Sequence, residues 1–310
     1  MEKKSRILLV VLLVAVMVMI TACSDSGEIK QPANIDSDSS AGFNDSGSNT
    51  SSEDDNTNDV DNIEVTIAET VLYEAEGVKV TATGYEEGWM GPEVKILVDN
   101  TSSKNVLVTA ESVSVNGYMM SYASLYADVA AGKKANESLT IMTSQLNQAG
   151  IETVAEIAFR IDISDADTWD TLATSELIAL NTSAAGMEQP VDDSGDVIYQ
   201  ADGIKIVCKG LKQDIIWDGT IVFYMENNSG SPITVYAENV SVNGFMQDAG
   251  LWSDLRNCTR IVDGMSLLDL SDLELENIDE IQNIEFTLRI INSETWEEIT
   301  VTDVIALNFE

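Results

Sequence analysis

Three aspartates crowd one loop, and carboxylate oxygens are the ligands that calcium prefers. Asp165, Asp167 and Asp170 surround Trp169. Calcium binds carboxylate and carbonyl oxygens, and weak sites suffice outside the cell. The spacing does not continue with the glycine and later glutamate of an EF-hand loop. Two interpretations stay open: a weak calcium site, or a solvated turn whose tryptophan packs on the edge of the fold.

Two cysteines are candidates for a disulfide. Cys208 and Cys258 both lie in the second half of a duplicated sequence, and the first half has no cysteine at either matching position. Outside the cell such a pair can form a bridge. The bridge needs a Cα separation of about 5.5 Å, which spacing along the chain does not establish. The alternative is two separate, small, buried thiols.

The composition excludes several kinds of chemistry. The chain has no histidine, so Ser-His-Asp and Cys-His catalysis and zinc sites with imidazole ligands are ruled out. With 53 acidic and 16 basic residues the formal charge is −37, and a nucleic-acid partner would need a basic surface instead. A hydrolase that uses a pair of carboxylates stays open as a third alternative, although no acid pair for it can be identified. We therefore expect neither an enzyme nor a resident cofactor, calcium excepted, and no nucleic acid.

The N-terminal segment has the features of an export signal. Lys3, Lys4 and Arg6 precede an apolar run at residues 7–20, which is shorter than the ~20 residues needed to span a bilayer. The run ends in Ile-Thr-Ala-Cys, with Ala22 before Cys23.

This tetrapeptide resembles the lipobox of bacterial lipoproteins. The resemblance implies cleavage between Ala22 and Cys23 and lipidation of Cys23. The expected location is the outer face of the cell membrane, where the lipid anchors an exported chain. The alternative is an ordinary secretory signal followed by a chance cysteine. Residues 1–22 are thus expected to be a signal peptide, and residues 23–65 an acidic, disordered linker, because Ser, Asp, Asn and Gly predominate there.

The remainder of the chain contains a duplicated domain. The pentapeptide Val-Ser-Val-Asn-Gly at residues 113–117 recurs at residues 240–244, 127 positions later (240 − 113). The tetrapeptide Ile-Ala-Leu-Asn at residues 178–181 recurs at residues 305–308 with the same offset. A match kept in register over such a distance indicates two tandem copies. We place them at 66–183 and 196–310, joined by a linker at 184–195.

Hydrophobic residues alternate with a period of two, which predicts strands. Val78, Val80 and Ala82 form one such run, and other runs lie at residues 94–98 and 157–163. Seven or eight short strands with turn signals between them predict an all-β fold in which each copy is a β-sandwich. Short helical turns are expected at residues 144–150 and 271–277, with Ser144 and Ser271 as N-caps.

A second resemblance concerns the two copies. The order strand, Asn-rich turn, strand, Val-Asn-Gly and a Gly-Lys stretch at residues 132–134 is similar to immunoglobulin-like modules of Gram-positive lipoproteins. Many of those modules are domains of unknown function. The resemblance therefore implies two tandem immunoglobulin-like sandwiches in the cell envelope, and no activity.

Aromatic side chains gather in the loops that follow each pentapeptide. The candidates for an interaction surface are Tyr118, Tyr122, Tyr126, Phe245 and Trp252. Protein interfaces favour aromatic residues, but such residues also close the ends of sandwiches. We expect a non-enzymatic binding or scaffolding module with a protein partner in the envelope. The alternative is a membrane-anchored receptor for a small ligand or a cation such as calcium.

Overall fold

The computed structural model describes residues 64–213, 219–267, 273, 275 and 277–309. The expected signal peptide (1–22), with Ala22, and the lipidated Cys23 lie outside these residues, as does the expected linker (23–65) up to residue 63. Within the described part, no helix has the length and apolar character to cross a membrane.

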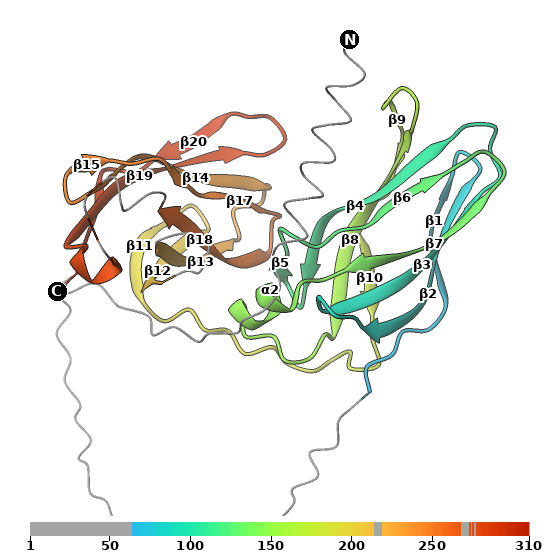
Figure 1. The fold of residues 1–310 in the computed structure, drawn as a ribbon, viewed down its shortest axis with the longest axis horizontal. Helices are drawn as coiled ribbons and strands as arrows, with labels where there is room; N and C mark the ends of the chain where they lie inside the picture. Colours follow the sequence, from blue (N-terminus) through green and yellow to red (C-terminus); the bar gives the residue numbers. More distant parts are fainter. Residues whose placement is uncertain (1–63, 214–218, 268–272, 274, 276, 310) are drawn as a thin grey trace, which may run out of the picture.

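Residues 66–183 contain the strands of one β-sandwich, here called the first repeat (Figure 1). Its elements are β1 (Thr70–Ala75), β2 (Val78–Glu87), β3 (Pro92–Asn100), β4 (Val106–Val115), β5 (Tyr118–Met119), β6 (Tyr126–Val129), β7 (Lys134–Thr140), α2 (Thr143–Gln148), β8 (Glu156–Asp165), β9 (Thr171–Thr174) and β10 (Ile178–Asn181). The two ends of this repeat meet, because Thr66 N donates to Ser183 Oγ at 3.0 Å.

The second repeat has the same order of elements, with one additional short strand, β16, and a 3-10 helix in place of α2. Its elements are β11 (Asp196–Ala201), β12 (Ile204–Lys212), β13 (Gly219–Asn227), β14 (Ile233–Val242), β15 (Phe245–Met246), β16 (Ala249–Gly250), β17 (Trp252–Leu255), β18 (Thr259–Leu267), η2 (Ile278–Glu280), β19 (Asn283–Asn292), β20 (Glu298–Val301) and β21 (Ile305–Asn308).

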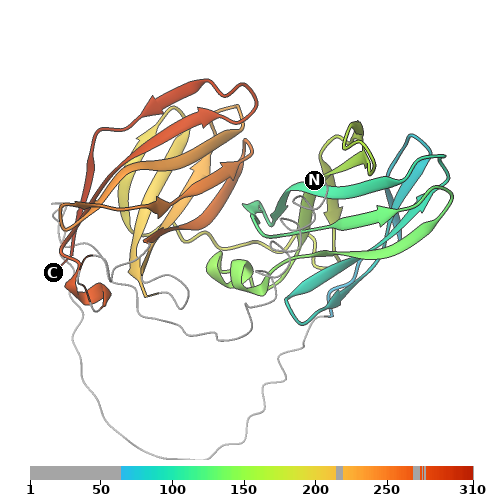
Figure 2. The same cartoon turned by 45° about the horizontal axis from the view of Figure 1, so that its top comes forward.

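The strands of each repeat form two sheets. In the first repeat one sheet has the order β1-β2-β3-β7, and the other is built on β10-β8-β4 with β5, β6 and β9 at its edges. In the second repeat the corresponding sheets are β11-β12-β13-β18 and a sheet built on β14 and β19. Figure 2 shows the two sandwiches next to each other. The predicted all-β fold of two tandem sandwiches is confirmed.

The alternating pattern of the strands builds the cores. In β3 the side chains of Val94, Ile96 and Val98 are buried between the sheets, whereas the residues between them are partly exposed. In the second repeat Phe223 on β13 meets Phe286 on β19 edge to face, with ring centroids 5.9 Å apart. Each large apolar side chain buried in this way stabilises the fold by roughly 1.5–3 kcal/mol.

Two buried asparagines fix the correspondence between the repeats. Asn100 Nδ2 donates to the carbonyl of Val129 at 3.0 Å, and Asn227 Nδ2 donates to the carbonyl of Leu255 at 3.1 Å. Counted from these asparagines along the paired strands, β7 corresponds to β18 with an offset of 126 (260 − 134). The same offset relates β6 to β17 through their pairing with β4 and β14.

The repeated pentapeptide forms the same tight turn twice. Asn116 and Gly117 have φ angles of 50° and 83°, and Asn243 and Gly244 have φ angles of 49° and 83°. Two successive residues with positive φ are the signature of a type I′ hairpin turn, which Asn-Gly favours. In both copies the asparagine side chain accepts two backbone N–H groups from the segment that enters the neighbouring strand. The turn therefore presents the next two residues in the same way in both repeats.

The expected helical turns are partly confirmed. The helix α2 lies where the first was expected, but Ser144 is inside the helix, and the N-cap residue Met142 makes no side-chain capping bond. Ser144 was wrong as the cap because the helix begins one residue earlier. Ser271 lies outside the described residues. The short helix η2 starts later, capped by Asn277, whose side chain accepts from Asp279 N.

Candidate functional site

The two repeats meet where the first pentapeptide hairpin docks on the second repeat. Tyr118 of β5 and Arg260 of β18 pair in parallel, and this pairing joins one sheet of each repeat into a single sheet. Arg260 N donates to the carbonyl of Gly117 at 3.0 Å, and its guanidinium carbon lies 5.3 Å from the centroid of the Tyr118 ring. Arg256 adds a bond from Nη2 to Ser114 Oγ at 2.5 Å.

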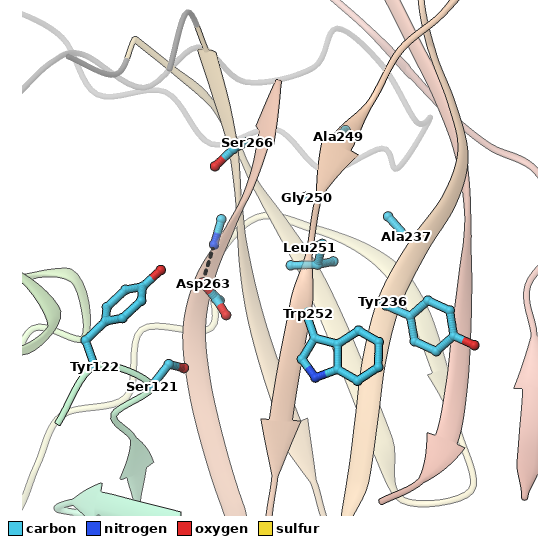
Figure 3. A pocket seen from close by; sticks show the side chains of 11 residues that line it. Ser121, Tyr122, Tyr236, Ala237, Ala249, Gly250, Leu251, Trp252, Asp263 and Ser266 are labelled. Atoms are coloured by element: carbon cyan, nitrogen blue, oxygen red, sulfur yellow. Dashed lines mark hydrogen bonds between the residues drawn. The ribbon is translucent and has the colours of Figure 1, made fainter. Parts of the chain in front are cut away.

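A cleft of about 480 Å³ opens beside this junction (Figure 3). Ser121 and Tyr122 of the first repeat form one side of it. Residues of β14, β16, β17 and β18 form the other side. Clefts of this size at domain boundaries are common ligand sites. The side formed by the second repeat contributes the carboxylate and two of the aromatic rings that line the cleft.

Two aromatic residues on that side of the cleft, Tyr236 and Trp252, belong to a group of three rings whose third member, Trp296, does not line the cleft. The Trp252 ring stacks on Tyr236 with centroids 5.2 Å apart, and the Trp296 ring lies 6.4 Å from Trp252. Tyr236 and Trp252 are direct cross-strand partners on β14 and β17, so strand pairing sets the stack. Trp252 is 54 % exposed and Trp296 is 66 % exposed. Large exposed aromatic rings in a group are typical centres of binding surfaces.

Asp263 brings a carboxylate to the cleft. It lies on β18 between Ile261 and Met265, which are buried in the core, so the period of the strand turns Asp263 inward as well. Ser253 Oγ donates to Asp263 Oδ2 at 2.7 Å, and Gly264 N donates to Oδ1 at 2.8 Å. Burial raises the pKa of Asp263 above its ordinary value, since these two hydrogen bonds offset only part of the lost hydration.

Tyr122 faces this carboxylate from the first repeat. Its backbone N–H donates to Gln145 Oε1 on α2 at 3.0 Å, so the short helix holds the loop in place. Figure 3 shows Asp263 between Tyr122 and Trp252. Partial desolvation and then the charge of Asp263 raise the pKa of Tyr122, so its hydroxyl keeps its proton at neutral pH.

This arrangement suits an organic cation. The faces of aromatic rings attract ammonium and guanidinium groups, and a carboxylate adds a charge-assisted hydrogen bond. A single carboxylate is a poor match for calcium, which takes six to eight oxygen ligands. Among the described residues there is no group of three or more His, Cys, Asp or Glu side chains that could hold a metal ion.

The first repeat does not contain the same site. The residues equivalent to Trp252, Ser253 and Asp263 are Tyr126, Ala127 and Glu137. Ala127 has no hydroxyl to hold a carboxylate, and the side chain of Glu137 is exposed on β7. The two repeats share a fold, but the acid-and-aromatic site belongs to the second.

The residues predicted as interaction loops lie in three different places. Tyr122 and Trp252 lie on opposite sides of the cleft. Tyr118 is 1 % exposed because it is buried against the second repeat within the same chain. Tyr126 and Phe245 are 59 % and 63 % exposed and do not line the cleft. Their role in binding a partner stays a prediction.

The three aspartates of the acidic loop do not converge on one point. Each has its own partner: Lys104 Nζ lies 3.2 Å from Asp165, Asn105 Nδ2 donates to Asp167 at 3.2 Å, and Thr168 Oγ1 donates to Asp170 at 2.9 Å. The Lys104 ammonium group and then a backbone hydrogen bond lower the pKa of Asp165. These three weak candidates for a calcium site therefore do not form one group of ligands in the described part of the chain.

The loop is a turn that both repeats share. Asp165 Oδ1 accepts the backbone N–H groups two and three residues later, and Asn292 does the same with its amide oxygen. Trp169 and Trp296 follow with φ angles of 68° and 62°. Trp169 is 65 % exposed, so the expected packing of this tryptophan on the sandwich edge was wrong.

The predicted disulfide between Cys208 and Cys258 is absent from the structure. Both thiols are free, with Cys208 buried and Cys258 exposed. Cys208 pairs with Phe223 on β13, whereas Cys258 N donates to the carbonyl of Asn227, four residues further along that strand. Four strand residues span roughly 13 Å, well beyond the reach of a disulfide.

Sequence reasoning missed Asp263, Ser253 and Tyr236. The signal for Asp263 was an acid at an inward position of the alternating run Ile261-Val262-Asp263-Gly264-Met265. The other two differ between the repeats, because Thr109 and Ala127 occupy the equivalent positions in the first copy. Comparing the two copies residue by residue would have singled them out.

Comparisons with known proteins add little. No family model matches this chain, and no curated protein matches it either. Among solved structures, a transglutaminase from red sea bream is similar with a TM-score of 0.20 and 7 % sequence identity. That alignment covers 76 % of this chain and 32 % of the transglutaminase chain. The present chain therefore spans about a third of that protein, and a TM-score this low supports no conclusion about activity.

Proposed function

We propose that this protein is a non-enzymatic binding module of the bacterial cell envelope, and that its cleft between the repeats receives a basic side chain of a partner protein. One observation carries the proposal. Asp263 is a partly buried carboxylate held by Ser253, and it lies between Tyr122 and Trp252 in an open cleft. The proposal places a lysine or arginine side chain between the two rings, with its charge directed at Asp263.

Burial makes this carboxylate selective for a charged partner. Because burial disfavours the ionised form of Asp263, an incoming cation gains more from it than from a fully hydrated carboxylate. The site itself loses little freedom on binding, since Trp252 is already stacked on Tyr236 and the Tyr122 loop is tied to α2. The formal charge of −37 attracts a basic partner over longer distances.

The N-terminal segment supports a location for this activity. The lipobox-like sequence ending in Cys23 and the acidic linker after it fit an immunoglobulin-like lipoprotein whose sandwiches extend from the outer face of the membrane. In that setting the module captures or organises a basic partner close to the membrane.

A second candidate is a receptor for a small organic cation. The cleft, at about 480 Å³, lies within the volume range of small-molecule sites and has polar groups from both repeats. A free amine and a lysine side chain offer the same ammonium chemistry, so experiment must separate the two sources.

Calorimetric titration of the full chain distinguishes these functions. The probes are an oligolysine peptide and n-butylamine, each added to the wild type, Asp263→Asn and Glu137→Gln. The two variants remove the same charge at equivalent strand positions. The proposal predicts peptide binding that weakens about tenfold or more in Asp263→Asn only. Strong binding of n-butylamine alone would favour the small-ligand receptor, and equal weakening in both variants would mean that only the overall charge attracts the peptide.

A further inference from the structure

The chain contains two copies of one hairpin, and only the first is covered. Tyr118 and Met119 of β5 are 1 % and 8 % exposed, because they dock on the second repeat. Phe245 and Met246 of β15 hold the same positions after the second Asn-Gly turn, and they are 63 % and 67 % exposed. Pairing with the parent strand is the same in both copies. The second hairpin therefore has the shape of a docking element without its counterpart.

The chain also contains two copies of the edge on which such a hairpin docks. In the second repeat this edge is β18, where Arg260 pairs with Tyr118 and Ser266 pairs with Gly250. In the first repeat the corresponding edge is β7. There Thr140 pairs with Ser124, as Ser266 pairs with Gly250 in the second repeat. Among the described residues no strand pairs with β7 on this side at Lys134, which corresponds to Arg260. A strand edge with free backbone groups is a template for another strand.

The side chains around the two edges are similar in character. Arg260 holds its cation 5.3 Å from the Tyr118 ring, and Lys134 places a cation at the equivalent position, where its Nζ also pairs with Asp99 Oδ2 at 2.6 Å. Tyr118 packs with Tyr224 and Val262 in one apolar cluster. Half-buried Leu97 corresponds to Tyr224, while Asn136 corresponds to Val262 and makes the first-repeat surface more polar.

We propose that this protein associates with a second copy of itself head to tail, the Phe245–Met246 hairpin of one molecule docking on the β7 edge of the next at Lys134. Among the described residues no strand docks on the Phe245–Met246 hairpin or on β7 at Lys134, and the junction inside the chain shows how such a pair fits together. Different surfaces meet in this contact, so association gives rings or open chains of molecules and not symmetric dimers.

Charge sets the conditions under which this contact forms. Two molecules with a formal charge of −37 repel each other at low salt. Apart from the Lys134 ammonium group, the contact is built from an aromatic ring, a methionine and backbone groups, and salt does not weaken these apolar and backbone contacts. Association therefore increases with ionic strength, as the Debye length falls from about 10 Å at 0.1 M to about 3 Å at 1 M.

Intermolecular disulfide formation tests the register directly. In a background of Cys23→Ser and Cys258→Gly, full-length chains carrying Phe245→Cys are mixed with chains carrying Lys134→Cys. Paired residues on neighbouring strands lie about 4.8 Å apart, which a disulfide can span. We expect a cross-linked heterodimer that is several-fold more abundant at ~1 M than at ~0.1 M salt. The control replaces Phe245→Cys with Tyr126→Cys, an equally exposed aromatic position away from the hairpin.

Two results would overturn the proposal. One is a yield no higher than that of the Tyr126→Cys control, which would indicate random collision. The other is a dominant product between two Phe245→Cys chains, which would indicate a symmetric contact. Sedimentation of the Phe245→Asp variant gives a check without cysteines. Because Phe245 is exposed, this variant should fold as the wild type does, and it should sediment as a monomer where the wild type forms larger species.

Discussion

Tyr118 and Phe245 occupy the same place in two copies of one hairpin, yet their side chains are 1 % and 63 % exposed. The turns before them have the same backbone conformation, and the strands beside them pair in the same register. The difference lies in what covers the hairpin, because the second repeat follows the first and receives its hairpin at Arg260. A sequence repeat has thus produced one internal contact and one surface element.

Tyr118→Ala should uncouple the two repeats. The substitution removes a buried ring that joins them, and we expect a loss of about 3–5 kcal/mol in the free energy of unfolding and separate unfolding of the two sandwiches. The matched change Phe245→Ala should stay within about 0.5 kcal/mol of the wild type, since that side chain is in solvent. Urea denaturation followed by circular dichroism measures both. Similar losses for the two variants would contradict the assigned docking.

Asp263→Asn should raise stability at neutral pH and weaken binding of a cation. Burial raises the pKa of Asp263, so the folded chain holds this proton more tightly than the unfolded chain. Its ionised form then opposes folding. This effect is absent below the unfolded pKa of about 3.9 and reaches its full size as pH rises through the higher folded pKa. Thermal unfolding between pH 3 and pH 8 should therefore show that the melting temperature of Asp263→Asn rises relative to that of the wild type as pH increases.

The control for that series is Glu137→Gln. It removes the same charge from the equivalent, exposed position of β7 and should leave the pH dependence almost unchanged. If both variants shifted the stability curve alike, net charge and not burial would be the cause.

Trp252→Ala and Tyr122→Ala should weaken binding of the oligolysine peptide without a comparable change in melting temperature. Each ring is more than half exposed, so its removal leaves no cavity in the core. Loss of a cation–π contact of about 1–2 kcal/mol corresponds to roughly tenfold in affinity. Tyr126→Ala changes the equivalent position of the first repeat and should bind as the wild type does. A fall in melting temperature that matches the fall in affinity would assign these rings to packing.

Cys258→Gly should stabilise the protein. Cys258 has a φ angle of 61°, and the equivalent residue of the first repeat is Gly132 with a φ angle of 68°. The left-handed conformation costs an ordinary side chain about 1–2 kcal/mol, and glycine loses up to about 1 kcal/mol through greater freedom of the unfolded chain. We expect a net gain of about 0.5–1 kcal/mol in chemical denaturation. Cys208→Gly, on buried β12, should destabilise the protein instead.

Asp165→Asn should be tolerated, whereas Asp165→Ala should cost about 1 kcal/mol of stability. An asparagine already makes the equivalent turn at Asn292, and alanine leaves two backbone N–H groups without their acceptor. The lowered pKa of Asp165 adds stability that is present above the unfolded pKa and is lost as pH falls through the folded pKa. Millimolar calcium should not shift the melting temperature of either form. A calcium-dependent shift abolished by Asp167→Asn would contradict this interpretation of the loop.

The architecture could be predicted from the sequence, because a duplicated segment and a hydrophobic period of two can both be recognised from the order of the residues alone. The period of two at Val94, Ile96 and Val98 predicted buried strand positions, and the structure confirms them. The Asn-Gly dipeptide marked both hairpin turns for the same local reason.

The candidate site could not be predicted, because it depends on how the two repeats lie against each other. Tyr122 meets Asp263 across a cleft that exists only after Tyr118 has docked on β18. Trp252 was singled out for its type, but its stack on Tyr236 follows from pairing between distant strands. The expected disulfide is absent for the same reason. The sequence does not show that Cys208 and Cys258 lie beside β13 at positions four residues apart, Phe223 and Asn227.

Photo-cross-linking on intact cells tests the central claim most directly. A photoreactive amino acid replaces Tyr122 or, as the control, Tyr126 in the full chain, and adducts are identified by mass spectrometry. The account predicts a discrete protein adduct at position 122 whose cross-linked peptide contains lysine or arginine, lost in Asp263→Asn and retained in Glu137→Gln. An adduct that forms equally at position 126, or that survives Asp263→Asn, would contradict capture of a basic partner in the cleft.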